Sequence, residues 1–347
     1  MPTFSPHTVT GESLYEKLKH VRIGGNTCLF TPEKCAELAP LANDILHLKR
    51  EKNAVILAHS YVSPEILYSV ADFVGDSYQL SKDAASTSAD TIVFSAVKFM
   101  ADTAKILSPQ KQVLVPSKLN GCTLADAITG AQVAELRKTY PDYTFVCYIN
   151  TTADVKAQCD VCVTSSNVAK IVAAIPNHNI YFLPDRLMAK NLINELRANG
   201  IDKNIPYWDG TCYVHQEYDV ELIHYLRSAY KDDLRVVSHP ECDETVAQAS
   251  DFVGSTSQMM RYVTDTNADA YFMLTECGLS SRLQIEHPNK KFVGTCTMCK
   301  YMKSNTLADI KRVLTAPDPD DIISIPPDTL SAAKRCIDAM FMYAEKR

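Results

Sequence analysis

The sequence predicts an α/β protein of three pseudo-symmetric, three-layer αβα units, whose small parallel sheets surround a central site. First, apolar, strand-like runs recur at intervals of 90 and 91 residues. Second, these runs alternate with helical patterns, as in parallel sheets covered on both faces. Third, a cysteine follows a small-residue turn near the end of each repeat: Cys122, Cys212, and one of Cys296 and Cys299. A repeat of this length favours three small units over one large doubly wound sheet.

The repeats divide the chain into an N-terminal extension and three α/β domains. We expect the extension to be irregular apart from one short helix, 13–21. Two helices near the C-terminus, 305–314 and 329–345, are expected to return to the first domain. The predicted boundaries are 1–40 for the extension, 41–122 for the first domain (completed by 300–347), 123–212 for the second and 213–299 for the third.

Within each domain, the expected strands are short apolar runs that end in polar residues. Pro64 suits the first turn of a helix, so a helix is expected from 65 to 74, and another after Ser77. Further helices are expected at 41–52, 99–107 and up to 175. The expected strands are 54–61, 91–95 and 112–116 in the first domain, 144–150, 160–164 and 179–185 in the second, and 234–241, 251–254, 269–274 and 291–294 in the third.

Composition and charge exclude several classes of protein. The 347 residues carry a net charge of −6, which argues against a broad nucleic-acid-binding surface. No apolar run approaches the ~20 residues of a membrane span. The first forty residues lack a signal-peptide core and contain several glutamates, so we expect a cytoplasmic protein. A disulfide framework is not expected there, and Cys147, Cys159 and Cys162 are predicted to be core residues.

Polar side chains stand where the first strand of each domain ends, and ligands bind beyond the carboxyl ends of parallel strands. Hydroxyl residues at the following helix starts suit N-caps, but the same helix termini also bind phosphate or carboxylate. Three such helix starts around one axis predict a substrate set rich in anionic groups. The candidate residues are His59, Tyr61, Tyr148, Asn150, His239 and Glu241 at the strand ends, and Ser77, Ser165, Ser255 and Thr256 at the helix starts.

The three recurring thiols offer soft ligands to one metal centre and leave a fourth position open. His215 lies three residues after Cys212, a spacing that also suits zinc. One alternative is therefore a zinc-dependent hydrolase or lyase that uses Cys122, Cys212 and His215. A second alternative is a non-enzymatic iron–sulfur redox sensor.

Nine ordered motifs across residues 45–310 give the chain a specific resemblance. They are LAHSY at 57–61, GDSYQL at 75–80, VKFMADTAKIL at 97–107, YINTTADVKA at 148–157, VTSSN at 163–167, CYVH at 212–215, HPEC at 239–242, VGSTSQM at 253–259 and MKSNTL at 302–307. With these motifs the chain resembles the quinolinate synthase family of pyridine-nucleotide biosynthesis. Asp102 and Lys300 depart from that pattern, which has Glu and commonly Pro at these positions.

The resemblance implies a [4Fe-4S] cluster held by Cys122, Cys212 and Cys299. It implies the condensation of iminoaspartate with dihydroxyacetone phosphate to quinolinate, with release of phosphate and water. A transient encounter with the L-aspartate-oxidising enzyme that supplies the imine is expected as well. The family motifs make Tyr61, Glu241, His215 and His239 catalytic, and His59, Ser77, Tyr148, Asn150, Ser165, Ser255 and Thr256 substrate-binding.

The choice between Cys296 and Cys299 also has a physical basis. A helix is expected to begin near residue 299, and a helix N-terminus favours the thiolate, which is the metal-binding form. The family motif places its ligand at the same position, three residues before Met302. Cys296 is then expected to be a resolving thiol that pairs with Cys299 under oxidation and switches the enzyme off reversibly.

Overall fold

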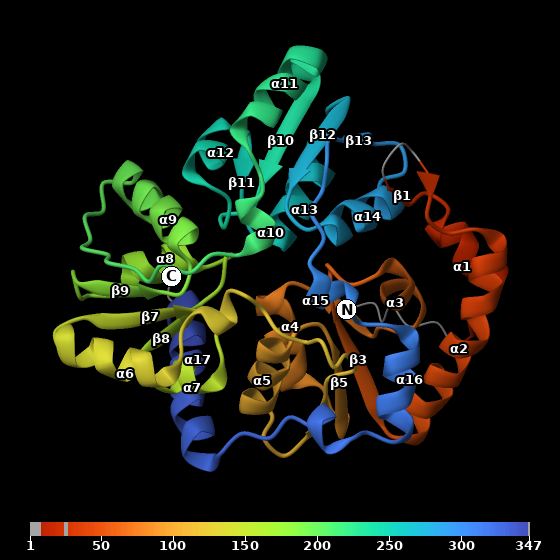
Figure 1. Cartoon of the computed structure of the whole chain (residues 1–347), viewed down its shortest axis with the longest axis horizontal. Coiled ribbons are helices and arrows are strands. Elements are labelled where there is room, and N and C mark those ends of the chain that lie inside the picture. The colour runs from red at the N-terminus through yellow and green to blue at the C-terminus, as the bar shows by residue number, and fades with distance from the viewer. Residues whose placement is uncertain (1–7, 24–26, 346–347) are drawn as a thin grey trace.

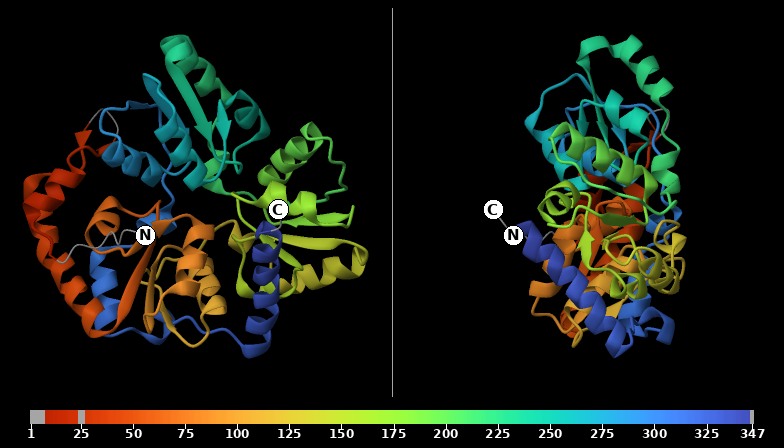
Figure 2. Two further views of the ribbon diagram at one scale, coloured as in Figure 1. Left: turned by 180° about the vertical axis from the view of Figure 1, so that it is seen from behind. Right: turned by 90° about the vertical axis from the view of Figure 1, so that its left-hand side faces the viewer.

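A computed structural model of the protein describes residues 8–23 and 27–345. It has three separate parallel sheets with helices on their faces, which confirms the predicted α/β class. The sheets form three lobes around a common centre, and the short helices α10 (Tyr213–Gln216) and α15 (Lys300–Lys303) lie close to that centre (Figure 1). Seen from the side, the molecule is thinner than it is wide (Figure 2).

The first sheet has the strand order β4-β3-β5-β6. All five residues of β5 are buried, because helices cover both faces of the sheet. Its elements are β3 (Ala54–His59), α3 (Pro64–Ser69), β4 (Phe73–Gly75), α4 (Ser77–Ser86), β5 (Thr91–Ser95), α5 (Lys98–Leu107) and β6 (Gln112–Leu114).

The second sheet has the order β8-β7-β9. Residues 204–210 run alongside β9 through isolated parallel bridges, in the place that β6 holds in the first sheet. The segment then leads to Cys212, as β6 leads to Cys122. The elements are the 3-10 turn Ala125–Ala127, α6 (Gly130–Thr139), β7 (Thr144–Tyr148), α7 (Ala153–Ala157), β8 (Val161–Val163), α8 (Val168–Ala174), β9 (Ile180–Leu183) and α9 (Arg186–Ala198).

The third sheet repeats the order of the first, as β11-β10-β12-β13. The leading strands β3, β7 and β10 begin at Ala54, Thr144 and Leu234, which confirms the regular repeat expected from the sequence. The elements are α10 (Tyr213–Gln216), α11 (Val220–Tyr230), the 3-10 turn Lys231–Asp233, β10 (Leu234–Ser238), α12 (Glu244–Ala249), β11 (Phe252–Val253), α13 (Thr256–Asp265), β12 (Ala270–Leu274), α14 (Cys277–Glu286) and β13 (Phe292–Val293).

Two predicted helices have different bounds in the structure. The helix expected over 65–74 ends at Ser69, and Phe73–Gly75 forms edge strand β4 beside β3. The helix expected at 41–52 is present as α2 (Pro32–Glu51), but it begins nine residues earlier and continues through Pro40. Thr31 caps this helix, and Pro32 lies in its first turn. Proline is favourable there because the backbone N–H that it lacks would have no hydrogen-bond acceptor within the helix. The other N-terminal elements are α1 (Gly11–Leu18), β1 (Arg22–Ile23) and β2 (Thr27–Cys28).

The C-terminal residues connect two of the lobes. After α15 (Lys300–Lys303), α16 (Leu307–Thr315) packs against α2 and β5. After the 3-10 turn Pro319–Asp321, α17 (Pro327–Glu345) packs mainly against α7 and β8 of the second sheet (Figures 1 and 2). Of the two final helices, only α16 therefore lies mainly against the first sheet.

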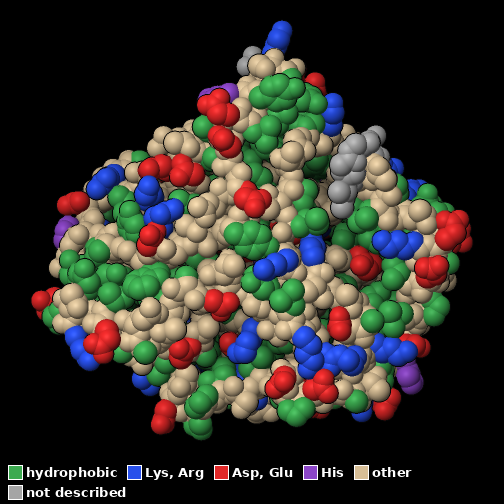
Figure 3. Space-filling model, in the orientation of Figure 1, with side chains coloured by type: hydrophobic (Ala, Val, Ile, Leu, Met, Phe, Trp, Pro, Cys, Tyr) green, Lys and Arg blue, Asp and Glu red, His purple; other side chains and the backbone are tan. Residues whose placement is uncertain are grey.

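Acidic and basic side chains are intermixed on the face of the molecule in Figure 3. Among the described residues, none of the helices combines the length and the apolar character needed to span a membrane.

Asp321 joins the connection before α17 to the first sheet. Its buried carboxylate accepts hydrogen bonds from Arg312 and from the backbone of Asp318, and it forms an ion pair with Lys118 at 2.7 Å. Burial alone raises the pKa of Asp321, but hydrogen bonds from Arg312 and Lys118 outweigh it and lower the pKa to about 2. The carboxylate therefore stabilises the fold above the unfolded-state pKa of about 3.9, and this stabilisation is lost as the pH falls through about 2.

We expect Asp321→Asn to lower the free energy of unfolding at pH 7 by about 1.5–3 kcal/mol. The lower end is favoured because Arg312 and Lys118 are partly exposed and solvent screens their charges. Urea denaturation at pH 7 measures the change, and its repetition toward pH 3 should show the difference from wild type shrinking. The exposed neighbour Asp320→Asn is the matched control. Equal effects of both substitutions would contradict the assignment.

Candidate active site

A cavity of about 70 Å³ lies where the three lobes meet. Thirteen of the fourteen candidate residues line it, although they come from segments up to 240 residues apart in the chain. The exception is Ser255. The candidate residues in the wall are His59, Tyr61, Ser77, Cys122, Tyr148, Asn150, Ser165, Cys212, His215, His239, Glu241, Thr256 and Cys299.

The three thiols reach the cavity by equivalent routes. Cys122 follows β6, whereas Cys212 and Cys299 are the N-cap residues of α10 and α15. The expected helix start at residue 299 is thus confirmed. The three cysteines are half-buried, and burial raises the pKa of Cys122 to about 12 and the pKa of the other two above the ordinary thiol value. These thiols are neutral unless a positive centre binds them, which is the behaviour of cysteines that ligate a metal.

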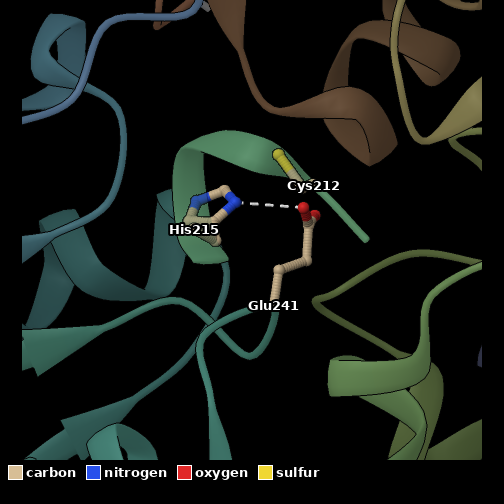
Figure 4. A group of neighbouring side chains, drawn as sticks. All are labelled: Cys212, His215 and Glu241. Atoms are coloured by element: carbon tan, nitrogen blue, oxygen red, sulfur yellow. Dashed lines mark hydrogen bonds and ion pairs between the residues drawn. The ribbon is translucent and has the colours of Figure 1, made fainter. Parts of the chain in front are cut away.

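Glu241 is a buried carboxylate of the cavity wall that lies close to Cys212 and His215. Its Oε1 accepts a hydrogen bond from the Tyr148 hydroxyl at 2.7 Å, and its Oε2 lies 3.0 Å from His215 Nδ1. Figure 4 shows His215 and Glu241 facing each other, with Cys212 at the start of the same helix as His215. Burial alone raises the pKa of Glu241, but His215, His239 and Tyr148 outweigh it and lower the pKa to about 2. The carboxylate is therefore ionised at neutral pH.

The two strand-end histidines are neutral. Burial lowers the pKa of His59 to about 4 and the pKa of His239 to about 3. His239 stacks on the His215 ring at a centroid distance of 4.6 Å, and His59 meets the Tyr61 ring edge-on at 4.5 Å. Neutral rings at these positions can donate or accept one hydrogen bond each without placing a further charge in the cavity.

Tyr61 heads a continuous chain of hydrogen bonds. Its hydroxyl lies 2.6 Å from Thr275 Oγ1, and Thr275 Oγ1 lies 3.1 Å from His215 Nε2. Thr256 Oγ1 donates to the Tyr61 hydroxyl at 3.0 Å, so the Tyr61 proton is directed toward Thr275. With Glu241 accepting from Nδ1 of His215, the chain runs from Tyr61 through Thr275 and His215 to Glu241. Burial raises the pKa of Tyr61 well above its ordinary value, so the phenol is a proton donor.

The helix starts divide into capping and cavity-lining residues. Asp76, not Ser77, caps α4, because its Oδ1 accepts from Gln79 N at 3.0 Å. Ser255 caps α13 and exchanges hydrogen bonds with Gln258. Ser77 and Thr256, the first helical residues, are left to line the cavity. Ser165 lines it as well, in the turn before α8.

Asn150 lies in a short turn that a buried lysine holds. Lys156 Nζ donates to the carbonyl oxygens of Ile149 and Thr151, on either side of Asn150. Its side chain has no exposed surface. A fully buried ammonium requires such acceptors, and in binding them it fixes the end of β7.

Sequence reasoning missed two acidic residues of the wall, Asp76 and Glu276, and it missed Thr275, which hydrogen-bonds with Tyr61 and His215. Thr275 and Glu276 follow β12, so the rule that identified His59 and His239 applies to them also, although β12 is the third strand of its unit rather than the first. Asp76 precedes Ser77 and is visible in the sequence as an N-cap.

The prediction for Cys296 was wrong about its partner. Cys296 forms a disulfide with Cys277, the first residue of α14, and Cys299 is a free thiol. The error has a topological cause: β12 and β13 are parallel neighbours, so the residue after β12 lies beside the loop after β13. A sequence separation of 19 residues hides that proximity.

Two groups of side chains in the cavity wall could bind a metal. Cys212, His215 and Glu241 hold their ligand atoms within 4.8 Å of one another, which suits a single zinc ion. However, both nitrogens of His215 already have partners, Glu241 and Thr275, so neither is free for a metal. Cys122, Cys212 and Cys299 have no such conflict and come from the three lobes to one cavity. This donor set fits a cluster that is bound by three thiolates.

The fold and the cavity define an α/β protein with acid–base residues and three converging thiols at the junction of three sheets. A family model described as quinolinate synthetase A protein matches residues 43–342. Quinolinate synthases similar to the chain include that of Caulobacter vibrioides, 38% identical over 94% of this chain and 86% of its own, and that of Aquifex aeolicus, 41% identical over 88% and 94%. That of Xylella fastidiosa is 43% identical over 78% of both chains. The chain belongs to the quinolinate synthetase A protein family and is an enzyme of NAD biosynthesis.

Proposed function

We propose that the protein condenses iminoaspartate with dihydroxyacetone phosphate to quinolinate, with release of phosphate and water. The observation that carries this proposal is the convergence of three free thiols with the chain from Tyr61 to Glu241 in one cavity. The named substrates together bring two carboxylates and one phosphate. Neutral His59 and His239, with Ser77, Asn150 and Ser165, supply hydrogen-bond donors for these groups.

Cys122, Cys212 and Cys299 would hold a [4Fe-4S] cluster. When bound by these three thiolates, the cluster would have one iron without a protein ligand and would supply Lewis-acid chemistry to a substrate oxygen. The three thiols and the acid–base residues Tyr61, His215 and Glu241 line the same cavity, so a substrate within it is in reach of both sets.

Tyr61 and Glu241 are the ends of the proton path. The Tyr61 hydroxyl gives its proton toward a leaving oxygen or takes one from carbon, and Thr275 relays the proton to or from His215 Nε2. Glu241 stabilises the imidazolium that forms, since its carboxylate lies 3.0 Å from Nδ1. The tautomerisation and dehydration steps of this condensation need such transfers in both directions.

Anaerobic purification followed by assay tests the proposal. We expect brown protein with broad absorption near ~400 nm, about four irons per chain and turnover of iminoaspartate with dihydroxyacetone phosphate. Colourless protein with one zinc per chain would favour the set Cys212, His215 and Glu241 and overturn the proposal. Brown protein without turnover would point instead to a redox-sensing role.

A further inference from the structure

Glu276 is a buried acid of the cavity wall that the proposed chemistry does not use. It follows β12, lines the cavity, and is 1% exposed. We propose that Glu276 is a positioning residue that ties the third cluster-binding thiol, Cys299, to the proton-transfer residue Tyr61. This inference rests on the proposed function, because it assigns the reason why two parts of the same site keep their relative positions.

The first connection is to the Cys299 loop. The backbone N–H of Cys299 donates to Glu276 Oε1 at 3.1 Å. A parallel bridge joins Glu276 to Thr297, and Cys277 N donates to the Thr297 carbonyl at 3.1 Å. The neighbouring disulfide between Cys277 and Cys296 joins the same two segments covalently. Residues 276–277 thus hold residues 296–299 along their length, and the Glu276 carboxylate is the contact made with the ligand residue itself.

The second connection is to Tyr61. Lys303 Nζ lies 3.1 Å from Glu276 Oε1 and donates to the backbone carbonyl of Tyr61. Glu276 Oε2 accepts from Gly278 N at 2.6 Å. A Cβ on Gly278 would stand 2.5 Å from the Tyr61 carbonyl oxygen, so this turn of α14 packs directly on the Tyr61 backbone. The carboxylate therefore orients both of the groups that contact the Tyr61 backbone.

The chemistry of these contacts requires a carboxylate. The partners of the two oxygens, Cys299 N, Gly278 N and Lys303 Nζ, are all donors. An ionised carboxylate only accepts, so it serves all of them, whereas an amide has one accepting oxygen and one donating nitrogen. In Glu276→Gln, the amide nitrogen must face either Cys299 N–H or Gly278 N–H and leave that donor unpaired. The substitution therefore keeps the shape of the side chain but removes the hydrogen-bonded link between Cys299 and Tyr61.

The test compares anaerobically purified wild type, Glu276→Gln and Glu286→Gln. Glu286 is at the other end of α14, is also ion-paired through Arg282, and does not line the cavity. The readouts are iron per chain and the rate at which a ferrous chelator removes that iron. We expect release from Glu276→Gln to be faster by about tenfold, the change expected when a hydrogen bond to a charged group is lost. Release from Glu286→Gln should match wild type.

Lys303→Met separates the second connection from the first, and it covers the case in which Glu276→Gln does not fold. This variant keeps the bond from Cys299 N to Glu276 but loses the contact with the Tyr61 carbonyl. Iron release should stay at the wild-type rate, while kcat falls about tenfold with KM little changed. Wild-type iron release from Glu276→Gln, or wild-type kcat in Lys303→Met, overturns the inference. Wild type that binds no iron refutes the proposed function instead.

Discussion

Cys299→Ser is expected to give colourless protein without measurable turnover, whereas Cys296→Ser should remain brown and active. Cys299 caps α15 and lines the cavity with a free thiol. Cys296 is exposed, and its sulfur is bonded to Cys277. A serine hydroxyl is a poor ligand for iron in a thiolate set, so loss of Cys299 removes one of three ligands. Iron analysis, the absorption near ~400 nm and the assay measure the result.

Cys277→Ser is the matched control, since it breaks the same disulfide from its other side. Both disulfide variants should keep their iron and their turnover, and both should lose a small part of their thermal stability. If Cys296→Ser bleaches the protein while Cys299→Ser stays brown, the ligand assignment is inverted. If both bleach it, the disulfide is itself needed to hold the loop in which Cys299 lies.

Much of this site could be predicted because polar residues at strand ends are visible in a sequence. The strands β3, β7 and β10 are apolar runs. The residues that follow them lie at the carboxyl ends of the sheets, so they come together where those ends of the three sheets converge. His59, Tyr148 and Glu241 were found in this way, without knowledge of their distances. The regular spacing of the repeat supplied the remaining assumption, that the three sheets share one centre.

The contacts between units could not be predicted in the same way. The pairing of Cys277 with Cys296 depends on β12 and β13 being parallel neighbours, and the partners of Thr275 come from two other segments. The end of α3 is a similar case: residues 70–74 carry no proline or glycine, and β4 forms because the edge of β3 is available to it. Local sequence patterns do not indicate which distant residues will become such tertiary partners.

Glu241→Gln is expected to lower turnover by roughly 10²-fold or more while leaving the protein brown. Glu241 accepts from the Tyr148 hydroxyl at 2.7 Å and faces His215 Nδ1 at 3.0 Å, and it is not one of the three thiol ligands. The amide that replaces it can accept from only one of these donors and carries no charge to stabilise an imidazolium on His215. The loss should therefore fall on kcat, with iron content unchanged.

The pH dependence gives this prediction a second readout. Because the pKa of Glu241 is lowered to about 2, the carboxylate is already ionised throughout the neutral range. Wild-type turnover should thus show no change caused by titration of Glu241 from about pH 6 to about pH 9, because that titration lies far below this range. The matched control is Glu244→Gln on α12, which pairs with Lys190 outside the cavity and should keep wild-type turnover. Near-normal turnover of Glu241→Gln would refute a role for this carboxylate in proton transfer.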